Sequence, residues 1–191
     1  MGEIIVGGSQ TADRLKTPGF VHLRVHSAHS LLEGALPLKK IMAKAVSDGQ
    51  PAIAITDTNN LFVALEFSEK ARDEGLQPII GCQMSIDMQD ATDDKRGNNN
   101  LAKLPSIVVL AADAQGYERL VDLISRAYLD GEGTGHAVSI TKSWLEEGDN
   151  SGLIVLTGAS TGPIDMALRD GHAGLAAKRL LTRSEERRVG K

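Results

Sequence analysis

SIVVLAADAQGYERLVDLISRAYL, residues 106–129, is the stretch that decides the fold class. The run SIVVLAA is short, apolar and rich in Val and Ile, which predicts a buried strand over 106–112. Asp113 is a good N-cap for a helix after this strand. The helix is predicted from apolar residues at three- and four-residue spacing, namely Tyr117, Leu120, Val121, Ile124 and Tyr128. A strand followed by an amphipathic helix is typical of α/β folds.

The same alternation extends along the rest of the chain. Apolar runs predict further strands over 20–26, 51–56, 77–81, 83–87 and 152–158. Periodicity and stop signals predict helices over 38–46, 61–74 and 141–147, and another that opens at Gly162-Pro163. The polar residues 88–105 are predicted to form a surface loop. We therefore expect a mostly parallel sheet covered by helices, with an open doubly wound sheet and a barrel both compatible with the pattern.

Composition places the chain among ordinary globular proteins. It has 191 residues, of which 41% are hydrophobic and 24% charged, enough for one domain with an aliphatic core. Cys82 is the only cysteine, so an internal disulfide is excluded, and we expect it to be a buried small hydrophobe. The apolar runs are too short to span a membrane and no signal segment opens the chain, so we expect a cytoplasmic location.

Charge is distributed unevenly. The net charge is −4, and residues 178–191 contribute six basic and two acidic side chains, which leaves −8 for the remainder. An acidic body is a poor surface for the phosphate backbone of DNA. We therefore expect neither direct DNA binding nor membrane binding.

Polar residues gather where the predicted strands end, which is where α/β folds place their sites and also where ordinary helix caps occur. These residues are His26, Ser27, His29 and Glu33, then Asp57 to Asn60, then Gly81 to Gln83, then Asp113, and finally Thr157 and Gly158. His22, Arg24 and His26 alternate along the predicted strand, so we expect all three to point to one face. Two imidazoles two residues apart on a strand are able to hold one Zn²⁺ or Mn²⁺. Arg24 stands between His22 and His26, and a guanidinium offers no lone pair and repels a cation. We expect Arg24 to fill that space and to pair with Glu33 or Asp57.

Five blocks, in order from about Phe20 to about residue 180, resemble a known family. They are FVHLRVHSAHSLLEG, PAIAITDTNNL, QPIIGCQMSI, IVVLAADAQGYERLVDLISRAYL and GLIVLTG. The family is the polymerase-and-histidinol-phosphatase (PHP) domain, and the most similar members open the alpha subunits of bacterial DNA polymerase III, of the DnaE type. The resemblance implies a distorted seven-stranded β/α barrel, truncated here at its C-terminus. We interpret residues 1–18 as a flexible arm, 19–182 as an incomplete PHP domain and 183–191 as a non-native tail.

Metal-binding members of the family hold a cluster of metal ions and use it to hydrolyse phosphoesters. Laid on this chain, the family's His-x-His falls on Arg24 and His26, and its next acidic residue falls on Glu33. Its Thr-Asp-His ends at Asp57 and Thr58, and its Gly-Cys-Glu ends at Gln83. A later histidine falls on Ser106 and a later cysteine on Ala159. A metal cluster needs several carboxylate or imidazole donors, so we expect these eight positions to be a degenerate site, with no metal, no other cofactor and no catalytic residue.

The resemblance leaves three functions open. The first is a non-catalytic domain that braces a replicative polymerase in DNA replication and docks its proofreading exonuclease subunit, epsilon. Its partners would be epsilon and the rest of the alpha chain; the parent protein would be a DNA-directed DNA polymerase, a nucleotidyltransferase whose active site lies outside this fragment. The second is an active 3′–5′ exonuclease or phosphoesterase that uses Zn or Mn. The third is a small-molecule phosphatase of the histidinol-phosphate type. The replaced donors favour the first.

Overall fold

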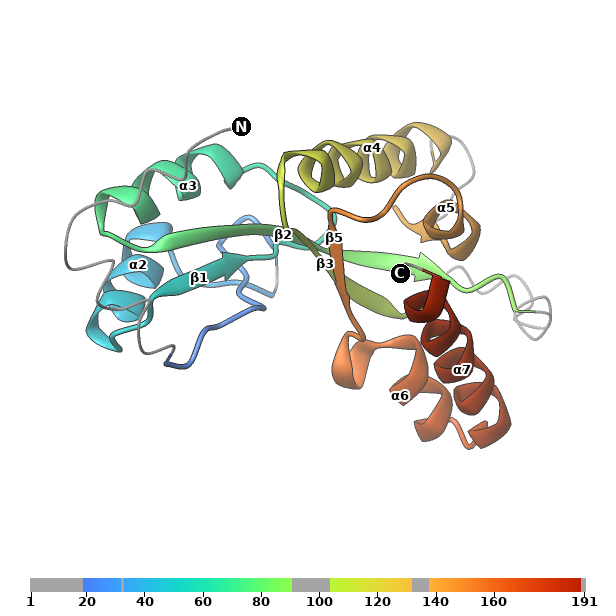
Figure 1. The fold of residues 1–191 in the computed structure, drawn as a ribbon. Coiled ribbons are helices and arrows are strands. Elements are labelled where there is room, and N and C mark those ends of the chain that lie inside the picture. Colours follow the sequence, from blue (N-terminus) through green and yellow to red (C-terminus); the bar gives the residue numbers. More distant parts are fainter. Residues whose placement is uncertain (1–18, 32, 91–103, 132–137, 190–191) are drawn as a thin grey trace. The chain divides into compact units, whose positions relative to one another are not determined.

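The computed structural model describes residues 19–31, 33–90, 104–131 and 138–189, which fall into two compact units (Figure 1). The first unit ends at Cys82 and the second begins at Gln83. The predicted arm over 1–18 and the part of the predicted loop over 91–103 lie outside the described residues. Among the described residues, no helix is both long and apolar enough to cross a membrane.

The first unit is a small α/β layer. Its elements are α2 (Leu38–Ser47), β1 (Ala52–Ile55), α3 (Ala64–Asp73) and the first part of β2 (Gln77–Asp87). β1 and β2 pair in parallel, with Ala52 opposite Gln77 and Ile55 opposite Ile80. All four residues of β1 are buried, as expected for a parallel strand covered on both faces.

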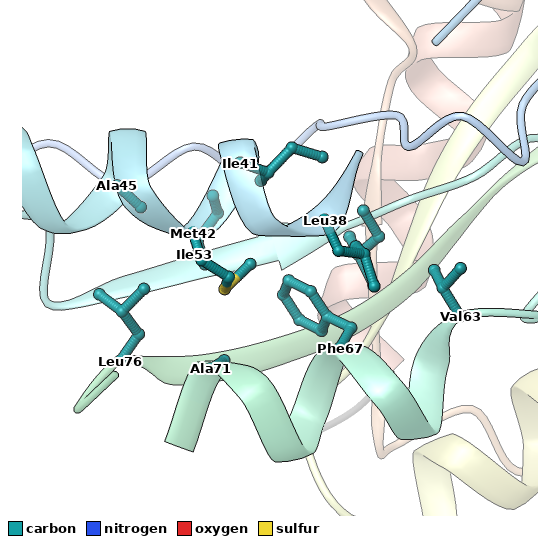
Figure 2. Close-up of a cluster of buried hydrophobic side chains, with 10 residues drawn as sticks. Leu38, Ile41, Met42, Ala45, Ile53, Val63, Phe67, Ala71 and Leu76 are labelled. Carbon is teal, nitrogen blue, oxygen red and sulfur yellow. The ribbon is translucent and has the colours of Figure 1, made fainter. Parts of the chain in front are cut away.

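The core of the first unit lies where the apolar faces of α2 and α3 meet β1 (Figure 2). Figure 2 shows Leu38 and Met42 of α2 and Phe67 of α3 pointing into the space between the two helices. Phe67 is fully buried, and burial of a phenyl ring contributes about 2–3 kcal/mol of hydrophobic stabilisation. The predicted helices over 38–46 and 61–74 are confirmed, although α3 begins three residues later than predicted.

The strand predicted over 20–26 is wrong, because no strand is assigned there. Two carbonyls of this segment accept hydrogen bonds from β1 and the residue after it, His22 from Ala54 N–H at 2.9 Å and Val25 from Thr56 N–H at 2.8 Å. The segment's own N–H groups donate to side chains, His22 to Gln50 Oε1 at 3.2 Å and Val25 to Thr56 Oγ1 at 3.1 Å. The carbonyls of the segment therefore bond to backbone groups as in a sheet, whereas its N–H groups bond to side-chain acceptors. The regular backbone hydrogen-bond pattern of a strand is lost.

The second unit contains the rest of β2 and most of the helices. Its other elements are β3 (Ser106–Ala111), α4 (Ala114–Gly131), β4 (Ile140–Thr141), α5 (Lys142–Glu146), β5 (Leu153–Leu156), the 3₁₀ turn η2 (Ala159–Thr161), α6 (Pro163–Arg169) and α7 (Ala173–Val189). Within this unit the strand order is β2-β3-β5, and β4 pairs with β2 in parallel. Helices α6 and α7 pack side by side (Figure 1). The α/β class predicted from the sequence is confirmed.

Strand β5 departs from the expected parallel sheet, because it pairs with β3 in antiparallel fashion. The chain enters β5 at the point where β3 ends, and Ala112 N–H donates to Gly152 O at 2.9 Å. Gly116, in the first turn of α4, packs so closely on Gly152 that a Cβ there would lie 1.8 Å from the Gly152 carbonyl oxygen. This contact brings the start of β5 next to the end of β3, which forces the antiparallel direction.

Helix α4 is confirmed, but the predicted apolar stripe is buried only in part. Leu120 and Leu123 are fully buried, whereas Tyr117 is 39% and Tyr128 44% exposed. The helix has two overlapping apolar stripes, and the close packing of Gly116 sets which of them faces inward.

Other boundaries also differ from the sequence prediction. The two strands predicted over 77–81 and 83–87 are one continuous β2. The predicted short helix with Trp144 and the helix opening at Pro163 are confirmed as α5 and α6. Helix α7 continues to Val189, through most of the segment 183–191 that we interpret as non-native, and that interpretation stays a prediction.

Candidate functional site

Asp57 is the centre of the candidate site in the first unit. It follows β1 and is buried, with 2% of its surface exposed. Its Oδ1 accepts hydrogen bonds from Ser27 N–H at 2.7 Å and from the Ser30 hydroxyl at 2.5 Å. Its Oδ2 accepts from the Ser27 hydroxyl at 2.7 Å. Sequence reasoning proposed a helix cap among Asp57 to Asn60, but the Asp57 carboxylate binds the 26–34 segment instead.

The two serines are in turn held by backbone donors. Ser27 Oγ accepts from His29 N–H at 3.1 Å, and Ser30 Oγ accepts from Thr58 N–H at 3.0 Å. Each hydroxyl therefore donates to Asp57 and accepts from the main chain, which fixes the direction of every bond. Both carboxylate oxygens of Asp57 are already engaged by protein donors.

Glu33 lies at the other end of the same segment. Thr58 Oγ1 donates to Glu33 Oε2 at 2.5 Å, and His26 Nδ1 lies 3.4 Å from the same oxygen. The side chains of His26 and Glu33 are 15% and 35% exposed. Four of the eight positions predicted from the family pattern therefore lie in or against the 26–34 segment. They are His26, Glu33, Asp57 and Thr58.

His26 decides whether this group of residues fits a metal ion. Its Nε2 is buried without a hydrogen-bond partner among the described residues, so it is the one ring atom open to a ligand. Glu33 lies against Nδ1, and the two nitrogens of an imidazole point in different directions. An ion held at Nε2 is therefore out of reach of the Glu33 oxygen that contacts Nδ1.

The remaining donors do not correct this mismatch. Asp57 is engaged by serines, and Thr58 offers a hydroxyl that is already donated to Glu33. In the part of the chain that the structure describes, no group of three or more His, Cys, Asp or Glu side chains is placed to hold a metal ion. Among the described residues, this arrangement of side chains does not fit a metal cluster.

Arg24 and His22 precede the 26–34 segment. Both side chains are exposed, and His22 makes an edge-to-face contact with Phe20, with ring centroids 4.7 Å apart. Because 20–26 is not a regular strand, the shared face predicted for His22, Arg24 and His26 loses its basis. The predicted pairing of Arg24 with Glu33 or Asp57 stays a prediction.

Gln83, Ser106 and Ala159 belong to the second unit. Gln83 and Ser106 are buried, and the Ser106 hydroxyl donates to Thr161 Oγ1 at 2.9 Å. Thr161 Oγ1 donates onward to the Gly158 carbonyl at 3.0 Å. Ala159 is exposed in η2. These three positions carry no ionisable side chain.

Cys82 is fully buried, as predicted. Its thiol donates to the Asp57 carbonyl at 3.2 Å, and burial raises the pKa of the thiol from 9.0 to about 12. A thiol that stays protonated is neither a nucleophile nor a ready metal ligand.

Sequence reasoning missed Ser30 and underestimated Ser27. Ser27 is among the polar residues that follow the first predicted strand, and none of the patterns described above singles out Ser30. The usable signal was the spacing of Ser27, Ser30 and Glu33, each three residues apart, which favours side-chain bonds within a turn. The turn is present, with Ser30 N–H donating to Ser27 O at 3.1 Å.

The sequence is similar to that of one known domain family and to those of several curated proteins. A sequence model described as the PHP domain matches residues 22–187. The DNA polymerase III alpha subunits of Buchnera aphidicola and Caulobacter vibrioides are 39% identical to the chain over 161 and 163 residues, and that of Escherichia coli K12 is 35% identical over 161. These alignments cover 84–85% of the chain but 13–14% of each relative, so the chain spans about one seventh of their length.

Two solved structures are similar at lower identity. One is from Bifidobacterium adolescentis and is described as a candidate metal-dependent phosphoesterase, with 15% identity and a TM-score of 0.42 over 83% of this chain and 52% of that one. The other is an amidohydrolase from Chromobacterium violaceum with bound sulfate and no metal, with 20% identity and a TM-score of 0.41 over 60% of this chain and 40% of that one.

Proposed function

Because the chain belongs to the PHP domain family, we propose that it acts in DNA replication as a non-catalytic PHP domain of a bacterial DNA polymerase III alpha subunit. In this role it braces the polymerase part of the alpha chain and docks the proofreading exonuclease subunit, epsilon, in the cytoplasm. The identity of 35–39% to alpha subunits supports the polymerase context. The acidic body of the chain supports protein partners over DNA.

The observation on which the non-catalytic role depends is that both carboxylate oxygens of Asp57 accept hydrogen bonds from protein donors. Hydrolysis by a PHP domain requires metal ions that lower the pKa of a bound water and offset charge on the phosphate. An acidic residue serves as a ligand through its lone pairs, and three hydrogen bonds from Ser27 and Ser30 compete for those of Asp57. We propose that Arg24, His26, Glu33, Asp57, Thr58, Gln83, Ser106 and Ala159 are the vestiges of the family's metal site.

The open Nε2 of His26 favours one competing function. A Zn- or Mn-dependent phosphoesterase would use that lone pair, with Glu33 against the Nδ1 side of the ring. Such a domain would hydrolyse a simple phosphodiester when the metal is supplied, and His26→Ala would abolish the activity.

Two assays on the purified chain test the proposal. The first measures binding of epsilon by isothermal calorimetry, and we expect a 1:1 complex with a Kd of about 1 μM or tighter. The second measures hydrolysis of a chromogenic phosphodiester with added Mn²⁺ or Zn²⁺, and we expect the chain and its His26→Ala variant to give the same background rate. Absence of an epsilon complex would contradict the docking role. Metal-dependent turnover that His26→Ala removes would establish the phosphoesterase instead.

A further inference from the structure

We propose that Asp57 is an internal anchor, whose carboxylate holds the 26–34 segment to the end of β1 without a cation. This inference rests on the proposed loss of the metal site and gives the retained acidic residue a task of its own. In a metal-binding site, an ion joins side chains from separate segments. In this chain, the carboxylate of Asp57 and two serine hydroxyls make that connection.

The anchor joins parts of the chain that are distant in sequence. Ser27 and Ser30 are separated from Asp57 by 30 and 27 residues. Three hydrogen bonds of 2.5–2.7 Å end on one carboxylate, which is the short range of charge-assisted bonds. The bonds lie in a buried place, where they gain strength from the low local dielectric.

A second connection ties the far end of the same segment. Thr58, the residue after the anchor, donates its N–H to Ser30 Oγ and its hydroxyl to Glu33 Oε2. Gly34 closes the segment against Ser27, since a Cβ on Gly34 would lie 1.9 Å from the Ser27 carbonyl oxygen. The segment is therefore fixed by protein groups at both of its ends.

The anchor also predicts that restoring metal-ligand side chains at other positions would not by itself restore metal binding. A cation that approached Asp57 would have to displace Ser27 and Ser30 from the carboxylate. The displaced hydroxyls would lose their acceptor while still accepting from His29 and Thr58 N–H. Buried hydroxyl donors without an acceptor are costly. At Asp57 the ligand side chain is present, but hydrogen bonds from serines hinder its binding to a metal. At positions such as Thr58 and Gln83, by contrast, the proposed site lacks a suitable ligand side chain.

The test compares melting temperatures of the chain and matched variants, with excess EDTA or excess MnCl₂. Ser30→Ala removes one anchor bond, and Ser68→Ala is its control, since the Ser68 hydroxyl donates to Leu65 O within α3. We expect Ser30→Ala to lower the Tm by about 3–6 °C and Ser68→Ala to change it by about 1 °C or less. Asp57→Asn should lower it by about 10 °C, and adding Ser30→Ala to Asp57→Asn should lower it little further.

Neither EDTA nor MnCl₂ should move the Tm of the unmodified chain, since a ligand shifts stability when it binds the folded state. A local readout accompanies the Tm: the Thr58 amide, which donates to Ser30 Oγ, should exchange with solvent faster in Ser30→Ala than in Ser68→Ala. If Asp57→Asn does not fold, the difference in Tm between Ser30→Ala and Ser68→Ala still tests the anchor.

Three results would overturn the anchor: a Tm lowered by EDTA, a Tm raised by MnCl₂, or equal effects of Ser30→Ala and Ser68→Ala. These results involve no epsilon subunit. Failure of the anchor and failure of the proposed docking role are therefore distinguishable, because the anchor is tested on the chain alone and the docking role on its complex with epsilon.

Discussion

Asp57, which follows β1 in the first unit, and Ser106, which begins β3 in the second, are both buried polar residues, but they are hydrogen-bonded in different ways. Asp57 is a carboxylate that receives three hydrogen bonds from two serines. Ser106 is neutral and donates one bond to Thr161, which has a carbonyl acceptor of its own. The comparison shows that an acidic residue in a candidate site says little about metal binding until the donors around its oxygens are known.

The largest predicted effect tests this comparison directly. Asp57→Ala leaves the donors of Ser27 and Ser30 without their acceptor, and we expect a loss of about 3–5 kcal/mol in the free energy of unfolding. Ser106→Ala leaves Thr161 bonded to Gly158, and we expect a loss of about 1 kcal/mol. Urea denaturation of both variants measures the difference. Equal losses would mean that charge and hydrogen-bond number do not distinguish the two sites.

The next largest loss of stability is expected for a substitution at Gly34. A methyl group at this position would meet the Ser27 carbonyl oxygen at 1.9 Å, a backbone atom that the anchor holds in place. We expect Gly34→Ala to cost about 1–3 kcal/mol, also by urea denaturation. Gly19→Ala is the matched control in the same unit, because a Cβ there has no neighbour within 4 Å. A Gly34→Ala variant as stable as Gly19→Ala would show that the segment yields easily.

The ionisation of Cys82 should make the stability of the folded chain depend on pH. Burial raises the pKa of its thiol from 9.0 to about 12. Below pH 9.0 the thiol is protonated in the folded and the unfolded chain, so its contribution to stability is complete. As the pH rises from 9.0 towards 12, the unfolded chain ionises first and the folded state loses stability.

The loss attributable to Cys82 should reach about 1 kcal/mol near pH 10. Urea denaturation at increasing pH should give a shallower alkaline decline for Cys82→Ala than for the unmodified chain. A second readout is the reaction with a disulfide reagent near neutral pH, which should be slow in the folded chain and fast in urea. Identical alkaline slopes for the two proteins would contradict the buried, protonated thiol.

The smallest effect is expected at the surface of α3. Glu66 is exposed and pairs with Lys70 one turn later, and the hydrogen bond from Lys70 lowers the pKa of the Glu66 carboxyl. Salt and water screen such pairs, so Glu66→Gln should leave the Tm unchanged at physiological ionic strength. A clear drop in Tm would mean that exposed charges matter in this unit as much as the buried carboxylate.

Sequence patterns predicted the elements whose formation is local. Helices α2 and α4 and strands β1, β3 and β5 follow from apolar periodicity or apolar runs, and Pro163 marks the start of α6. The direction of β5 and the rotation of α4 were beyond these patterns, because both depend on the close contact of Gly116 with Gly152. Two glycines that meet across the fold leave no periodic signal in the sequence.

The candidate site was predictable in its members but not in their roles. The family pattern pointed to His26, Glu33, Asp57 and Thr58, and the structure places them around one segment. It did not predict that Ser27 and Ser30 engage Asp57, or that Glu33 contacts the Nδ1 side of His26. Spacing identifies residues of a suitable type, whereas tertiary packing decides which atoms of each residue remain available.

Metal content tests the central claim most directly. The purified chain is dialysed against excess Mn²⁺ and then Zn²⁺, freed of unbound ions, and analysed for metal and protein together. The account predicts less than about 0.1 metal ion per chain, and the same value for His26→Ala. One or more ions per chain that His26→Ala removes would contradict it, because the carboxylate and imidazole atoms described above as engaged or divergent would then have to converge on a cation.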